Sequence, residues 1–204
     1  MKKVIFTIVA LCIIGTSSVG AQAVWGARIG VSRPMLTFSD SDWSDNWKGK
    51  FGLEVGPVLY YSFKNNFYLN TAAMFSIKTF KESWSDEYGY GTESLTAYYV
   101  DVPVYAGYNF KLGKVSLYAQ AGPYLGVKIA ENYSFETDDG HEDEGDILTR
   151  IDAGLGIMAG VNIKRFKVEV GYKWGLANVL KEEEGGDEIK MHINSLFLGV
   201  GFVF

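Results

Sequence analysis

Residues 51–63 read Phe-Gly-Leu-Glu-Val-Gly-Pro-Val-Leu-Tyr-Tyr-Ser-Phe, and their odd and even positions differ in kind. The odd positions are apolar or aromatic: Phe51, Leu53, Val55, Pro57, Leu59, Tyr61 and Phe63. The even positions are mixed: Gly52, Glu54, Gly56, Val58, Tyr60 and Ser62. A period of two is typical of a β-strand whose faces meet different surroundings. The segment therefore predicts a strand with one apolar face and one face that combines glycine with charge.

The same alternation recurs between turn signals along the 204-residue chain. It predicts eight strands, over residues 24–32, 49–63, 67–79, 98–110, 115–129, 147–163, 166–177 and 193–204. The composition agrees, because 15% of the residues are aromatic, 24 are glycine and only four are proline. This composition excludes a disordered chain, a collagen and a coiled coil. The net charge of −5 argues against a nucleic-acid partner.

Charge and glycine share one face of these strands. The charged residues of the strand cores on that face are Arg28, Glu54, Lys78, Asp101, Lys128, Arg150, Asp152, Glu169 and Lys173. The same face holds fourteen of the 24 glycines: Gly26, Gly30, Gly52, Gly56, Gly107, Gly122, Gly126, Gly154, Gly156, Gly160, Gly171, Gly175, Gly199 and Gly201. Crowding that requires glycine is expected inside an eight-stranded barrel, whose interior is only just wide enough for side chains.

The glycine face is therefore predicted to line the lumen, and the apolar face to meet lipid. This arrangement predicts an all-β fold, an eight-stranded antiparallel transmembrane β-barrel. The alternative is a soluble, lipocalin-like barrel with the two faces reversed. Pro57, Pro103 and Pro123 interrupt the strands and are expected to mark bulges, because proline cannot donate to a ladder.

The connections between the strands alternate in length. Residues 64–66, 111–114 and 164–165 are short and basic, whereas 33–48, 80–97, 130–146 and 178–192 are long. Outer-membrane barrels have short periplasmic turns and longer external loops. We therefore expect short periplasmic turns, four longer extracellular loops and both termini in the periplasm.

The N-terminus is predicted to be a signal peptide over residues 1–23, cleaved after Ala21 or Ala23. A membrane anchor is the alternative, but the apolar run is shorter than the roughly 20 residues that a spanning helix needs. The barrel would then occupy residues 24–204. Cys12 is the only cysteine, so the mature chain is expected to have neither disulfides nor a thiol nucleophile.

The predicted lumen charges nearly balance, which favours a salt-bridge network that fills the barrel. A narrow ion-conducting path is the alternative. The predicted external loops are rich in acidic residues, for example over 131–146 and 181–190. They are interpreted as solvated loops; the alternatives are weak binding of divalent cations, which could bridge to lipopolysaccharide, and contact with a protein or surface ligand.

Four fragments, in this order, resemble the small porin-family outer-membrane β-barrel proteins, the PorT-like group of Gram-negative bacteria. They are Tyr99-Val100-Asp101-Val102-Pro103 with Tyr108-Asn109-Phe110, Gly122-Pro123-Tyr124-Leu125-Gly126, Asp152-Ala153-Gly154 with Gly160, and Tyr172 with Gly175-Leu176-Ala177-Asn178. The resemblance spans the mature chain and implies an outer-membrane barrel, without implying one activity. The C-terminal Val200, Phe202 and Phe204 resemble a targeting signal, which implies the barrel-assembly machinery as a partner.

The sequence favours a non-enzymatic envelope or surface-interaction protein whose partners are outer-membrane lipid, lipopolysaccharide and an unknown protein or surface ligand. Narrow porin-like transport and an accessory role in protein secretion are the alternatives. The histidines are His141 and His192, and His192 has the opposite parity to Ser195, so a hydrolase is not expected. No phosphate-loop, zinc or calcium pattern is present in the sequence, which predicts no cofactor and no metal.

Overall fold

A computed structural model describes residues 22–38, 48–86, 89–113, 115–137, 140–142, 147–180 and 190–204. Residues 1–21, which hold nearly all of the predicted signal peptide, lie outside the described residues. Within the described ranges, no helix has the length and apolarity needed to span a membrane.

Eleven strands and one short helix make up the described chain. They are β1 (Gln22–Phe38), β2 (Lys48–Gly49), β3 (Gly52–Ser62), the 3₁₀ helix η2 (Lys64–Asn66), β4 (Phe67–Ala72), β5 (Met74–Asp86), β6 (Gly89–Leu112), β7 (Val115–Thr137), β8 (Gly140–Glu142), β9 (Ile151–Ile163), β10 (Phe166–Gly175) and β11 (Met191–Val203).

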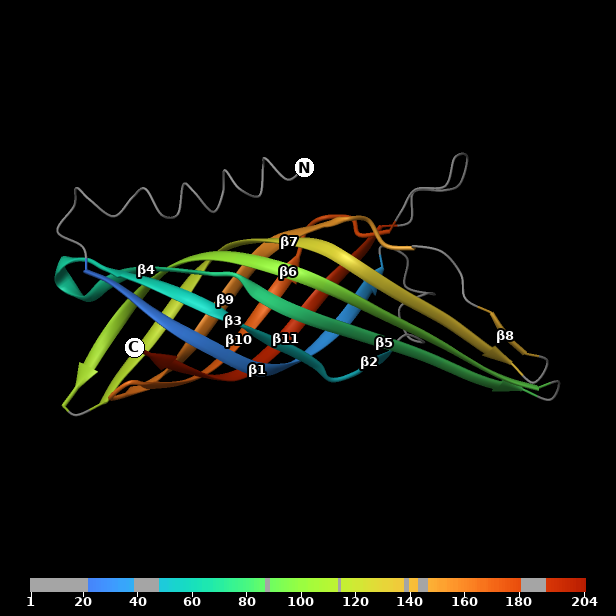
Figure 1. Cartoon of the computed structure of the whole chain (residues 1–204), viewed down its shortest axis with the longest axis horizontal. Helices are drawn as coiled ribbons and strands as arrows, with labels where there is room; N and C mark the ends of the chain where they lie inside the picture. Colours follow the sequence, from blue (N-terminus) through green and yellow to red (C-terminus); the bar gives the residue numbers. More distant parts are fainter. Residues whose placement is uncertain are drawn as a thin grey trace.

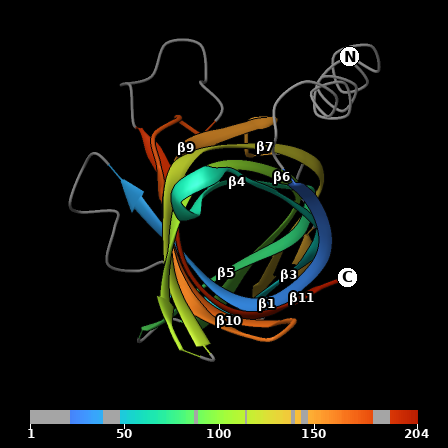
Figure 2. The same cartoon turned by 90° about the vertical axis from the view of Figure 1, so that its left-hand side faces the viewer.

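Antiparallel pairing closes these strands into a ring (Figure 2). In the ring, β1 pairs with β3, and β3 pairs with β4 and with β5, which continues β4. The next strands round the ring are β6, β7, β9, β10 and β11, and β11 pairs with β1 to close it. Counting β4 and β5 as one, the ring has eight strands. The predicted eight-stranded antiparallel barrel is confirmed.

The faces of the barrel follow the predicted parity. Glycines and most of the predicted charges point inward, whereas large apolar residues are exposed on the outer surface, among them Ile29 (51% exposed), Leu155 (50%) and Leu198 (57%). The soluble alternative with reversed faces is therefore wrong. An outer surface of this kind is stable against hydrocarbon but not in water, because in water a continuous apolar band would be exposed to solvent.

The expectation of a bulge at each proline is wrong. Pro57 lies opposite Ala73, accepts a hydrogen bond from the Ala73 amide (3.1 Å) and has no N–H to return, so the ladder breaks between β4 and β5. The pairs before and after the break keep the same register. The β6–β7 register is likewise unchanged on the two sides of Pro103 and Pro123.

The bulge lies instead on β7, opposite Tyr98 and Tyr99 of β6. Tyr98 pairs with Ala130, but Tyr99 pairs with Lys128, so Ile129 is an extra residue. An extra residue reverses the parity of everything that follows it on the strand. Ile129 and Ala130 are consequently both exposed.

Three strands continue well beyond the ring. The pairing of β7 with β9 ends at Val127. The pairing of β6 with β7 continues further, as far as the pair of Gly91 and Thr137, and the pairing of β5 with β6 continues to Asp86. Figure 1 shows these strands projecting from the end opposite the short turns. Much of the predicted loops 80–97 and 130–146 is therefore strand, because neighbouring strands satisfy each other's backbone groups. Beyond the ring, the two faces of a strand need not differ, so these segments lack the alternation by which the sequence analysis recognised strands.

Side chains fill the interior in layers. A cluster at the end with the long connections contains Leu36, Phe80, Leu95, Ala97, Tyr99, Leu148, Val179, Met191 and Ile193. A middle cluster contains Tyr105, Met158 and Phe197. A third, toward the short turns, contains Val58, Tyr60, Tyr68, Ala72, Met74 and Tyr118. The charged residues lie between and beside these layers.

Candidate functional site

Eight of the nine predicted lumen charges are buried, from Asp152 at 0% exposed to Lys173 at 8%. They reach the lumen because strand alternation sends every second side chain inward, and seven of the ring strands supply them. The eight are Arg28, Glu54, Lys78, Asp101, Lys128, Asp152, Glu169 and Lys173.

Arg150 is the exception, and its expected place in the lumen is wrong. It is exposed, and it lies in a bend just before β9 begins at Ile151. Strand parity cannot be extended to a residue outside the ladder. Its backbone carbonyl nevertheless supports the network, since it accepts a hydrogen bond from the Lys128 amide (2.8 Å).

Five residues form the central charge network. The Lys173 Nζ lies 2.9 Å from the Glu54 Oε1 and 2.9 Å from the Asp101 Oδ2. The Lys78 Nζ lies 2.8 Å from the Asp152 Oδ2 and 3.8 Å from the Asp101 Oδ1. Asp101 thus joins the two lysines, and the network ties together β3, β5, β6, β9 and β10.

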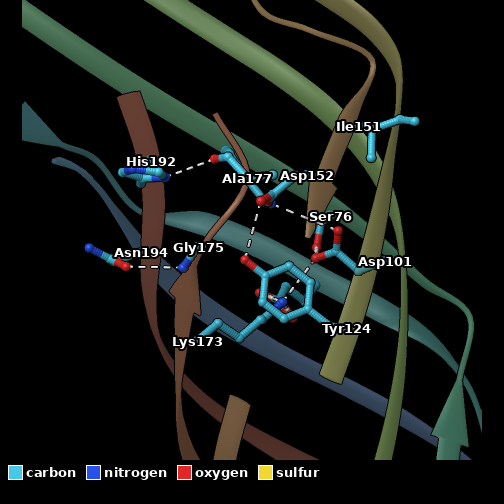
Figure 3. A network of polar contacts seen from close by, with 12 residues as sticks. Ser76, Asp101, Tyr124, Ile151, Asp152, Lys173, Gly175, Ala177, His192 and Asn194 are labelled. Atoms are coloured by element: carbon cyan, nitrogen blue, oxygen red, sulfur yellow. Dashed lines mark hydrogen bonds and ion pairs between the residues drawn. The ribbon is translucent and has the colours of Figure 1, made fainter. Parts of the chain in front are cut away.

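Neutral groups complete this network (Figure 3). Ser76 donates a hydrogen bond to the Asp101 Oδ2 (3.0 Å), and Tyr124 donates one to the Asp152 Oδ1 (3.3 Å). Buried carboxylates need such partners, because each ion leaves its hydration shell behind. The central network therefore cross-links the barrel and occupies its cross-section.

A second pair lies toward the short turns, where Arg28 contacts Glu169. Glu169 also accepts a hydrogen bond from the Tyr118 hydroxyl, and the Arg28 Nη2 donates to the Asn70 Oδ1 (3.3 Å). This pair connects β1 to β10 over the inner face of β11, which lies between them, and β4 and β7 contribute the neutral partners.

A third pair joins Lys128 to Glu131, whose side chain is only 1% exposed. Glu131 was assigned to an acidic external loop, so this placement corrects that expectation. The bulge at Ile129 explains it, because the reversed parity turns Glu131 inward beside Lys128. The adjacent apolar residues Ile129 and Ala130, which break the alternation, were the available signal in the sequence.

Lys167 is the other buried charge that was missed, at 7% exposed. Its parity on β10 is that of Glu169 and Lys173, so the sequence did carry the signal. Lys167 was missed because it lies close to the basic turn at Lys164 and was not counted among the charges of the strand core. With Glu131 and Lys167 included, the described interior holds five cations and five carboxylates, and its formal charge is zero.

Half of the fourteen lumen glycines make room for aromatic rings, and most of the others lie against backbone of a neighbouring strand. A Cβ on Gly156 would meet the Tyr105 ring and hydroxyl, and one on Gly30 or Gly199 would meet the Phe197 ring. These contacts show why charge and glycine share a face: an eight-stranded lumen holds large side chains only where the facing wall has none.

The residues considered for hydrolysis do not converge. The His192 Nδ1 lies 2.9 Å from the Ala177 carbonyl oxygen, whereas Ser195 is 2% exposed on the inward face. His141 lies on β8, and its side chain is outside the described residues. Among the described residues, no group of three or more histidine, cysteine, aspartate and glutamate side chains is arranged to hold a metal ion.

The C-terminal residues of the predicted targeting signal lie on the outer face. Val200 is 47% and Phe204 69% exposed, and the Phe202 ring contacts those of Phe166 and Phe204 at centroid distances of 5.2 and 5.7 Å. This placement is compatible with recognition by an assembly machinery, which stays a prediction.

Comparison with known proteins gives one family and several solved structures. Residues 20–181 match the family described as outer membrane protein beta-barrel domain. The attachment invasion locus protein Ail of Yersinia pestis is 16% identical with a TM-score of 0.41, and Neisserial surface protein A is 14% identical with a TM-score of 0.44. In both cases 90% of this chain and 99% of the other are covered.

The N-terminal barrel domain of Pseudomonas aeruginosa OprF is 16% identical with a TM-score of 0.35, again over 90% of this chain and 99% of that one. No curated protein matches the chain. The family match covers most of the sequence, and the closed ring with its apolar exterior agrees with it. The chain therefore belongs to the outer membrane protein beta-barrel domain family.

Proposed function

We propose that this protein is a non-enzymatic surface-interaction protein, which presents the projecting part of β5, β6 and β7 to a partner outside the cell. The observation that carries the proposal is the length of these strands. β6 has 24 residues and β7 has 23, whereas a tilted transmembrane strand needs about 9–11. Roughly half of each strand is therefore left over to form a sheet beyond the membrane.

The filled interior supports this role over transport. Aqueous channels occur in barrels of more strands, and here the central charge network and the apolar clusters occupy the lumen. An additional reason is the rigidity of a paired sheet, which presents a partner with a surface that needs little ordering on binding. The identity of the ligand, the role of the acidic loops, contact with lipopolysaccharide and the PorT-like grouping with its secretion role stay predictions.

Cysteine labelling on intact cells tests which end faces outward. Ser85→Cys lies in the last part of β5, and Lys64→Cys lies in the exposed short turn at the other end. In a chain that also carries Cys12→Ser, each is the only cysteine. We expect a membrane-impermeant maleimide to label Ser85→Cys on intact cells and Lys64→Cys only after lysis. The reverse pattern would contradict the proposal.

The same two variants test the interaction itself when a membrane-permeant benzophenone maleimide, which reaches both positions, is attached to the cysteine. Illumination of intact cells is expected to give discrete cross-linked products from position 85 and none from position 64. Products of equal intensity from both positions, or from neither, would count against a partner at the projecting sheet.

Planar-bilayer recording separates this proposal from narrow transport. With five ion-paired or hydrogen-bonded cations and the clusters in place, we expect no reproducible single-channel steps from the purified barrel. Regular steps that persist across preparations would favour the transport alternative.

A further inference from the structure

A cavity of about 550 Å³ opens at the end of the barrel that carries the short turns. Its wall draws on strands from all round the ring and on η2, so it is the mouth of the lumen (Figure 2 views this end). Its charged lining residues are Lys111, Lys164 and Lys167, and no aspartate or glutamate lines it. The neutral polar lining residues are Ser62, Asn65, Asn66, Asn109, Ser116 and Asn162.

Lys167 differs from the other interior cations. Within the described ranges, Arg28, Lys78, Lys128 and Lys173 each have a carboxylate within 4 Å, and Lys167 has none. Its Nζ lies instead 3.9 Å from the centroid of the Tyr118 ring and 4.7 Å from that of Tyr60. Aromatic faces attract a cation, but they do not neutralise its charge.

A chain of hydrogen bonds holds this ammonium at the cavity. The Lys167 Nζ donates to the Asn162 Oδ1 (2.5 Å), and the Asn162 Nδ2 donates to the Asn109 Oδ1 and the Ser116 Oγ (both 3.0 Å). The amide of Asn162 is thereby oriented with its oxygen toward the lysine. The ammonium keeps further N–H donors that can serve a ligand.

The local charge is positive. Glu169, the carboxylate of this part of the lumen, is engaged by Arg28 and by the Tyr118 hydroxyl. This end of the lumen therefore holds two buried cations, Arg28 and Lys167, but only one carboxylate, and Lys111 and Lys164 add two more positive charges at the rim. A buried charge without a counter-ion is costly, and an anion that entered the cavity would compensate it.

We infer that this cavity binds a phosphate group, held by Lys167 with help from Lys111, Lys164 and the asparagine amides. Lysines are common phosphate ligands, and neutral amide donors complete the shell of an oxyanion. The volume leaves room for a substituent on the phosphate. The same chemistry is offered by free phosphate and by a phospholipid headgroup of the adjacent leaflet, and the experiment below separates the two sources.

The test is an amide NMR titration of the mature barrel, refolded in a non-ionic maltoside detergent that contains no phosphate. One arm adds inorganic phosphate, a second adds short-chain phosphatidylglycerol below its micelle concentration, and sodium chloride of equal ionic strength is the control. We expect saturable shifts confined to the short-turn end, such as those of the Asn66, Asn109 and Asn162 amides, and none from chloride. Saturation only with the lipid assigns the site to a headgroup, and saturation with inorganic phosphate assigns it to the free anion as well.

Variants decide whether Lys167 is responsible. Lys167→Met is expected to weaken binding at least about tenfold, whereas Lys48→Met, exposed on β2 at the other end of the barrel, leaves it unchanged. Heat-dependent gel mobility checks folding, and if Lys167→Met does not fold, the Lys111→Ser/Lys164→Ser variant decides, with weakening of several-fold expected. The inference is overturned by the absence of saturable shifts in both arms, or by unchanged binding in the deciding variant.

Discussion

Replacement of Lys173 by methionine is expected to destabilise the folded barrel by about 3–5 kcal/mol. The substitution keeps the length of the side chain and removes the ammonium that lies between Glu54 and Asp101. Both carboxylates are nearly inaccessible, at 4% and 1% exposed, so water cannot replace the lost partner. The measurement is the free energy of unfolding in urea, with the barrel in lipid vesicles.

Two further variants identify the cause. Lys48→Met removes an exposed charge on β2 and is expected to change stability by less than about 0.5 kcal/mol. Adding Asp101→Asn to Lys173→Met removes one of the stranded carboxylates and should restore part of the loss, as expected for directly coupled residues. A loss below about 1 kcal/mol for Lys173→Met would show that the network is not needed for folding.

Replacement of Leu198 by arginine is expected to cost about 2–4 kcal/mol in a bilayer. Leu198 is 57% exposed on the outer face of β11, and its neighbours across the two adjoining strands are Val31 and Val170. Both are exposed apolar residues as well, so this position lies within the band that meets hydrocarbon. A guanidinium there loses its hydration and gains no partner.

Leu112→Arg is the matched control. Leu112 is 55% exposed at the end of β6, directly before the turn at Gly113. The same substitution at the membrane interface is expected to cost only about 0–1 kcal/mol, since the charged group can reach water. Folding yield into vesicles and urea unfolding measure both variants, and equal costs at the two positions would contradict the proposed placement of the apolar band.

The sequence predicted the closed ring and its sidedness because both depend on a local rule. Alternation along each strand places Glu54, Asp101 and Lys173 on one face whatever their partners are. The same alternation predicted the short connections 64–66, 111–114 and 164–165, although Lys111 and Leu112 still belong to β6. It failed at Arg150, which is outside the ladder, and at Glu131, where one extra residue in β7 reversed the parity.

The partners of the charges could not be predicted from the same pattern. Lys173 meets Glu54 across 119 positions of sequence and Asp101 across 72, distances that are closed only by the register of every strand between them. The cavity around Lys167 likewise needs the whole ring, since its wall comes from strands at both ends of the chain.

The alternation of the sequence thus determined whether each strand residue faces the lumen or the outside of the barrel, because a pleated strand points every second side chain in the same direction. Which charges pair, where the β5–β6–β7 sheet extends beyond the ring and which lysine is left without a carboxylate were decided only when the strands closed into a ring. Closure sets the stagger between strands, and that stagger depends on all of them together.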